Sequence, residues 1–143
     1  MSNNSVQDDI WKFMQKHLGY NDEQLEKFIS NPRNLKVFEK WNDLLNKTII
    51  FEVVESHGCN IEHKIGDQFL FSATGYMLAH KCPKKICPFI MPTMARMMAI
   101  IQERIYEGID PMPLFYRGQC EDVGIDCGGW GRVIIEPKIV NRI

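Results

Sequence analysis

Apolar residues in the first 45 positions recur at the spacing of an α-helix. They form three short stripes: Ile10, Phe13 and Met14; Leu25, Phe28 and Ile29; and Leu35, Phe38 and Trp41. Gly19 is a natural helix stop. Asn21 with Gln24 resembles a capping box, and Asn31 with Pro32 predicts a further helix start. The pattern therefore predicts a helical N-terminal region over residues 1–46, in which the aromatic side chains pack in the core.

The pattern changes to that of β-structure at Thr48. The β-branched run 48–55 predicts a strand, and residues 66–72 predict a second strand that is entered through a Gly-Asp turn. Residues 73–79 predict a turn and a short third strand. Residues 131–140 predict the last strand, in which Val133 and Ile135 alternate with Ile134.

Between these strands, the segment from Cys82 onward returns to helical spacing, with Met91, Met94 and Met98 on one face. Pro88 and Pro92 predict either a kink or a regular helix that begins near one of them. We therefore expect an α+β fold with an N-terminal helical region, a small mostly antiparallel sheet and one long helix packed on it. The 143 residues suit a single domain, residues 1–143, with an α+β core over 47–143.

Composition narrows the classes of function. The net charge of −1 predicts no nucleic-acid partner and no anionic membrane partner. No apolar run approaches the roughly 20 residues of a membrane-spanning helix. The polar N-terminus lacks the charged and apolar regions of a signal peptide, so we expect a cytoplasmic protein. Five cysteines in a reducing compartment are not expected to form structural disulfides.

The cysteines all fall in predicted loops or at element boundaries, and four of them adjoin Gly or Pro. Their spacings, C-x4-C and C-x6-C, differ from the C-x2-C of common zinc knuckles and bacterial cluster motifs. Metal ligands, reactive thiolates and inert buried thiols all remain open. The candidate metal ligands are Cys59, Cys82, Cys87, Cys120, Cys127 and His63.

Cys87 has a second argument for a thiolate. If the regular helix begins at Pro88, the thiol lies at a helix N-terminus, where the dipole and free N–H groups favour negative charge. Lys84 and Lys85 either favour the same charge state or form a solvated face.

Histidines add to the chemistry of residues 57–69. His63 lies four residues after Cys59, so it either shares a metal ion with that thiol or acts as a general base, with Asp67 orienting its ring. We interpret His57 as an exposed turn residue. His80 is a further candidate ligand, and His17 is structural.

The segment 117–130 combines charge with glycine. Its backbone N–H groups could approach an anionic ligand beside a flat tryptophan wall, or the segment could be a hairpin-like turn. Arg117 either clamps a carboxylate or pairs with Glu121. The expected binding partner is therefore a small anionic molecule. The candidate catalytic residues are His63, Cys87, Asp122 and Arg117, and the candidate ligand- or cofactor-binding residues are Gly128, Gly129 and Trp130.

Residues 48–137 resemble a small uncharacterised family of cysteine-containing proteins from anaerobic bacteria and archaea. The resemblance lies in "EVVESHGCNIEHKIGDQF", the Cys-Pro at Cys82, the following Cys87, "CEDVGIDC" and the closing "VIIE". It implies an anaerobic, thiol-rich context and no particular activity. The family positions that it implies are Cys59, His63, Lys64, Gly66, Asp67, one of Cys82 or Cys87, Cys120 and Asp122.

Three functions remain open from the sequence. The first is a metal- or iron–sulfur-binding protein of an anaerobe, holding a cluster or a zinc or iron ion through its cysteine loops. The second is a small-molecule hydrolase or lyase with Cys87 or Cys120 as nucleophile and His63 as base. The third is a non-catalytic interaction module, in which Trp11, Phe28 and Trp41 form a homodimer or partner surface. Whether the protein is an enzyme stays open.

Overall fold

The structure is a computed structural model that describes the backbone of residues 3–143 and the side chains from residue 7 onward. The chain divides into two compact units, Met1–Glu39 and Lys40–Ile143. The first unit contains the helices α1 (Asn3–Leu18), α2 (Asp22–Ile29) and α3 (Pro32–Glu39). The second contains α4 (Trp41–Leu45), β1 (Lys47–His57), β2 (Gln68–Ser72), η1 (Ala79–Lys81), α5 (Met91–Tyr106), β3 (Gly118–Gln119), η2 (Ile125–Cys127) and β4 (Arg132–Asn141).

The helix boundaries of the first unit follow the local signals in the sequence. Gly19, with φ +71°, ends α1, and Asn21 and Gln24 form the predicted capping box at the start of α2. The Trp11 ring is buried and stacks on Phe38 with ring centroids 4.2 Å apart. Trp41 belongs to the second unit. Homodimerisation through the N-terminal helices stays a prediction.

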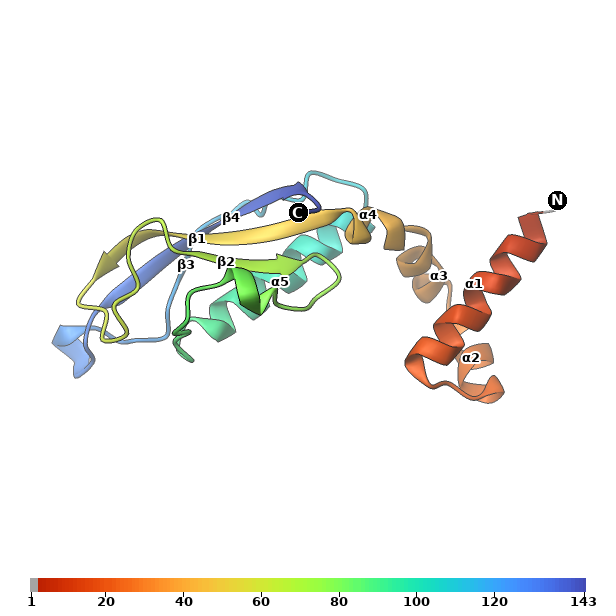
Figure 1. Ribbon diagram of the computed structural model, residues 1–143, viewed down its shortest axis with the longest axis horizontal. Helices are drawn as coiled ribbons and strands as arrows, with labels where there is room; N and C mark the ends of the chain where they lie inside the picture. Colours follow the sequence, from red (N-terminus) through yellow and green to blue (C-terminus); the bar gives the residue numbers. More distant parts are fainter. Residues whose placement is uncertain (1–2) are drawn as a thin grey trace. The chain divides into compact units, whose positions relative to one another are not determined.

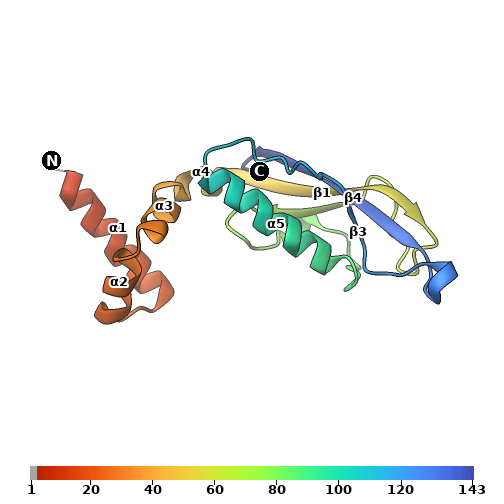
Figure 2. The ribbon, with the colours of Figure 1, turned by 180° about the vertical axis from the view of Figure 1, so that it is seen from behind.

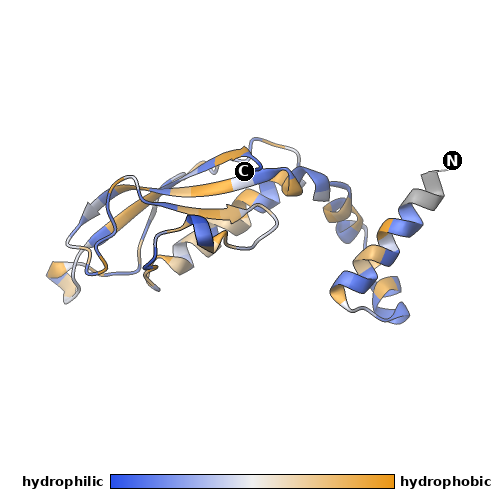
Figure 3. Cartoon of the chain, in the orientation of Figure 1, coloured by the Kyte–Doolittle hydropathy of each residue, from blue (hydrophilic) through white to orange (hydrophobic). Residues whose placement is uncertain are grey.

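The second unit is a two-layer α+β structure, which confirms the predicted fold class. Its antiparallel sheet has the order β2-β1-β4-β3, with β1 and β4 paired along almost their whole length. Helix α5 lies across one face of this sheet (Figures 1 and 2). Hydrophobic residues run along the middle of β1 and β4 (Figure 3), where alternate side chains face α5.

The core forms between those facing side chains. Phe51 of β1 and Ile135 of β4 are fully buried, as is Ile101 of α5. Val133 and Ile135 are buried while Ile134 is half-buried, so the alternation predicted for the last strand is confirmed. A Cβ at Gly118 would collide with Thr93 of α5, because β3 passes very close to the helix.

One sequence prediction is wrong, and of the two predicted helix starts the one near Pro92 is confirmed. Residues 73–79 form a turn, one isolated bridge between Phe71 and Met77, and the start of η1, because the tight turn around Gly75 leaves no room for a regular strand. Helix α5 begins at Met91, with Ile90 as N-cap and a proline in its first turn. Cys87 therefore lies in the preceding loop and not at the helix N-terminus. The short strand β3 was not predicted.

Within the described residues, no helix has both the length and the apolar character needed to span a membrane.

Candidate functional site

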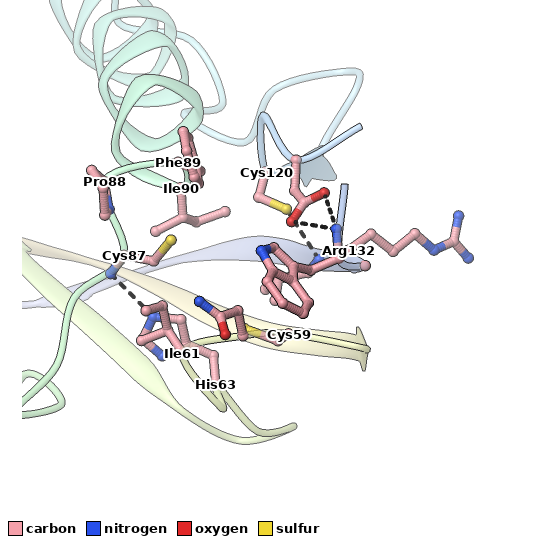
Figure 4. A pocket seen from close by; sticks show the side chains of 14 residues that line it. Cys59, Ile61, His63, Cys87, Pro88, Phe89, Ile90, Cys120 and Arg132 are labelled. Atoms are coloured by element: carbon pink, nitrogen blue, oxygen red, sulfur yellow. Dashed lines mark hydrogen bonds between the residues drawn. The ribbon is translucent and has the colours of Figure 1, made fainter. Parts of the chain in front are cut away.

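Three loops of the second unit meet around one pocket with a volume of about 170 Å³. One loop follows β1 and carries Cys59, one precedes α5 and carries Cys87, and one follows β3 and carries Cys120 (Figure 4). His63 lines the same pocket. The structure thus brings together three of the five cysteines and one histidine from distant parts of the sequence.

Close contact between the ends of β1 and β4 positions Cys59. The pairing of the two strands shifts register between Val53 and Glu55, a β-bulge that turns the end of β1. Gly58 then adopts φ +66°, and a Cβ there would lie 2.7 Å from the carbonyl oxygen of Trp130. A Cβ at Gly131 would collide with the carbonyl oxygen of His57. Two glycines therefore let the Cys59 turn lie directly against the start of β4.

His63 connects two of the loops. It is 4% exposed and packs edge-on against Phe69. Its Nε2 accepts a hydrogen bond of 3.3 Å from the backbone N–H of Cys87 (Figure 4), and its Nδ1 lies 3.6 Å from the Asp67 carboxylate. Because Nε2 is an acceptor, a neutral ring carries its proton on Nδ1, which faces Asp67. The ring therefore fixes Cys87 in place through the backbone.

Cys120 is held by the start of β4. Its N–H donates to the carbonyl oxygen of Val133 at 3.0 Å, and its sulfur accepts the N–H of Val133 at 3.3 Å. The next residue, Glu121, donates its N–H to the carbonyl oxygen of Phe89 at 2.8 Å, which joins the Cys120 loop to the Cys87 loop. Backbone hydrogen bonds thus fix Cys120 from both sides.

The sulfurs divide into two groups by their partners. Within residues 3–143, no hydrogen bond joins the sulfur of Cys59 or Cys87 to another group. The Cys82 sulfur instead accepts the N–H of Leu70 at 3.3 Å and lies 3.4 Å from the carbonyl oxygen of Leu78, to which it donates. Cys127 is exposed on η2. Neither Cys82 nor Cys127 lines the pocket.

Asp122 organises the loop at the mouth of the pocket. Its carboxylate accepts the backbone N–H groups of Gly124 at 2.9 Å and of Trp130 at 3.0 Å. These hydrogen bonds, with that of Gly124 the strongest, hold the pKa of Asp122 below its ordinary value. A Cβ at Gly129 would collide with the same carboxylate, so glycine is required where the loop folds over it. The Asp122 carboxylate therefore binds backbone N–H groups of its own loop.

The remaining candidates lie at the rim or outside it. Trp130 lines the pocket and is 67% exposed, whereas Gly128 and Gly129 do not line it. Arg117 also lies outside the lining, and pairs with Glu136 at 3.2 Å and Glu55 at 3.8 Å. His57 and His80 are exposed.

Sequence reasoning did not single out most of the pocket wall. The apolar lining residues are Ile61, Pro88, Phe89, Ile90, Trp130 and Val133, and the Asn60 carboxamide adds a polar group. The predicted alternation of Val133 and Ile135 with Ile134 was the available signal for the β4 side. The loop residues between Cys87 and α5 carried no such pattern, because their position depends on which loops meet.

No three His, Cys, Asp or Glu side chains of the described residues stand close enough, as placed, to bind a single ion. For a single ion at the pocket, the cysteine side chains would have to rotate toward it. In a [4Fe–4S] cluster each thiolate binds a different iron atom, so its thiolates stand farther apart than those around a single ion.

Comparison of the chain with protein-family models, with curated protein sequences and with solved structures returns no match. The chemistry of the pocket is therefore inferred from its own residues.

Proposed function

We propose that the pocket binds an iron–sulfur cluster, or a single zinc or iron ion, through Cys59, Cys87 and Cys120. The observation that supports this most is the arrival of three thiols, from three loops distant in sequence, at one cavity. Thiolates are the preferred ligands of iron–sulfur clusters and of thiophilic ions.

The partners of the sulfurs favour ligation over inert burial. A structural thiol is surrounded by protein, as Cys82 is by the backbone of β2 and η1. Cys59 and Cys87 face a cavity instead and make no hydrogen bond within the described part of the chain. Cys59, Cys87 and Cys120 also pack against the hydrophobic core, so the cavity that they share, and not their burial, supports ligation.

The Cys120 sulfur accepts a backbone N–H from Val133 at 3.3 Å, as the Cys82 sulfur does from Leu70, so the position in the pocket lining and not this bond separates the two cysteines. Hydrogen bonds of this kind to ligand sulfurs are one means by which proteins set the reduction potentials of their clusters. The same donor stabilises a thiolate that binds a single ion.

Three protein thiolates leave one metal position open. In this proposal His63 is a positioning residue and not a ligand, because its Nε2 already accepts the Cys87 N–H. An open position permits a small molecule to bind to the metal. The metal then acts on that molecule as a Lewis acid, or the site carries electrons.

The hydrolase or lyase alternative fits the same pocket less well. A general base needs a free ring nitrogen that faces the substrate. In His63, Nε2 is taken by Cys87 and Nδ1 faces Asp67. Neither nitrogen faces the pocket as a free acceptor.

Metal analysis of cysteine variants tests the proposal. Wild type, Cys59→Ser, Cys87→Ser and Cys120→Ser are purified without oxygen, and their iron, zinc, sulfide and visible spectra are measured. We expect metal in the wild type and at least about a tenfold loss in each variant, because each removes one of only three ligands. Cys82→Ser and Cys127→Ser are the matched controls and keep the wild-type content. Equal metal content in all six proteins would reject the proposal.

A further inference from the structure

The polar groups of the pocket show which molecules can bind there. The charged groups around it are already paired within the protein. Asp122 accepts backbone N–H groups, and the Arg132 guanidinium points away from the pocket (Figure 4) and pairs with Glu55 at 3.2 Å. His63 is held by Cys87 and Asp67. A charged ligand would lose its hydration without gaining a counter-charge.

The walls favour an apolar body. Ile61 and Phe89 line the pocket from two loops and Val133 from β4, and Trp130 adds a flat ring at the rim. The volume of about 170 Å³ is similar to that of a cavity of roughly 150 Å³ that holds benzene. The space therefore suits a molecule of about one ring.

One neutral group remains to recognise such a molecule. The Asn60 carboxamide lines the pocket and makes no hydrogen bond within the described residues. An amide offers both donors and an acceptor, so it can bind a hydroxyl or a carbonyl group. A ligand that satisfies it gains specificity over a purely apolar one.

We infer that the pocket binds a small uncharged molecule with an apolar body and one neutral hydrogen-bonding group, which Asn60 recognises. The inference goes beyond the proposed function and concerns the pocket without bound metal, because a metal ion or cluster would take up part of the same volume of about 170 Å³ and would offer an anion a counter-charge. It also favours an uncharged ligand over the anionic molecule that the sequence suggested.

Binding of four one-ring probes tests this inference. Benzyl alcohol, toluene, benzoate and benzylamine are titrated into protein from which any metal has been removed with a chelator, and backbone amide shifts are followed by NMR. We expect benzyl alcohol to bind at least about tenfold more tightly than benzoate or benzylamine. Its shifts should centre on Ile61, Phe89 and Val133. Equal binding of benzoate, or shifts away from these residues, would overturn the inference.

Two variants examine the wall and the amide separately. Asn60→Ala should weaken benzyl alcohol by about three- to tenfold and leave toluene unchanged, while the exposed Asn42→Ala changes neither. Ile61→Trp should block both probes, and Ile65→Trp, at a 70% exposed position outside the pocket, should block neither. If Asn60→Ala weakens both probes equally, the role of Asn60 is wrong.

Metal content measured before the chelator is added separates this inference from the proposed function. Metal present before chelation, with no benzyl alcohol binding after it, overturns the inference alone. Benzyl alcohol binding to a protein that never contains metal overturns the proposed function alone.

Discussion

The turn around Cys82 and the pocket around Cys87 use the same residue type in opposite ways. In the turn, the sulfur is bonded to the backbone of Leu70 and Leu78 and helps to close the edge of β2. In the pocket, the Cys87 sulfur faces a cavity shared with Cys59 and Cys120. The comparison shows that the fold, and not the spacing along the chain, decides which thiols meet at the pocket.

Of the changes around the pocket, removal of the His63 ring should lower the free energy of unfolding most. His63→Ala leaves the Cys87 N–H without its acceptor and removes a buried ring from Phe69. We expect the free energy of unfolding to fall by about 3 kcal/mol, measured by urea denaturation. The exposed His57→Ala is the control and should change it by less than about 0.5 kcal/mol. Equal stability of the two variants would show that His63 does not link the loops.

Adding a methyl group at Gly131 should separate the ends of β1 and β4. Because its Cβ would collide with the carbonyl oxygen of His57, Gly131→Ala should cost about 2 kcal/mol and displace Cys59 from the pocket. Urea denaturation and the alkylation rate of Cys59 measure the two effects. Gly19→Ala, in the first unit, strains a φ of +71° without meeting a neighbouring atom, so it should lower stability and leave the alkylation rate of Cys59 unchanged. An unchanged rate in Gly131→Ala would contradict the proposed role of this contact.

For the turn around Cys82, substitution of the cysteine should lower the stability of the protein and leave its metal content unchanged. Cys82→Ala removes the hydrogen-bond partner of Leu70 and should lower the free energy of unfolding by about 1 kcal/mol. Its metal content should match the wild type. If Cys82→Ala loses metal while keeping wild-type stability, the division of the cysteines into two groups is wrong.

Acid should loosen the loop at the pocket mouth before the rest of the unit. The pKa of Asp122 is lowered by backbone hydrogen bonds, so its contribution is present above the ordinary aspartate pKa of about 3.9 and is lost as pH falls through the lower folded value. The amide signals of Gly124 and Trp130 should shift in that range. In Asp122→Asn this transition should be absent, whereas Asp126→Asn, also on this loop, should keep it. The same titration in Asp122→Asn and wild type would contradict this account.

Local signals in the sequence were enough for most elements of the fold. The capping box at Asn21 and the alternation of Val133, Ile134 and Ile135 each depend on neighbouring residues, so they could be predicted. The start of α5 could not, because Pro88 and Pro92 are both compatible with a first turn and tertiary contacts decide between them.

The site depended on contacts distant in sequence. Cysteines 59, 87 and 120 were candidates by residue type, but their meeting follows from the β1–β4 register and the close approach at Gly58 and Gly131. The spacings C-x4-C and C-x6-C place Cys82 with Cys87 and Cys120 with Cys127. In the structure one member of each pair lines the pocket and the other does not, so spacing alone did not indicate which thiols meet.

The most direct test of the central claim compares two multiple variants. A Cys59→Ser/Cys87→Ser/Cys120→Ser protein and a Cys82→Ser/Cys127→Ser protein are purified without oxygen beside the wild type, and the iron, zinc and sulfide per chain are measured. We predict that the first variant contains no bound metal and that the second contains as much as the wild type. Metal retained by the first variant, or lost only from the second, would contradict the account.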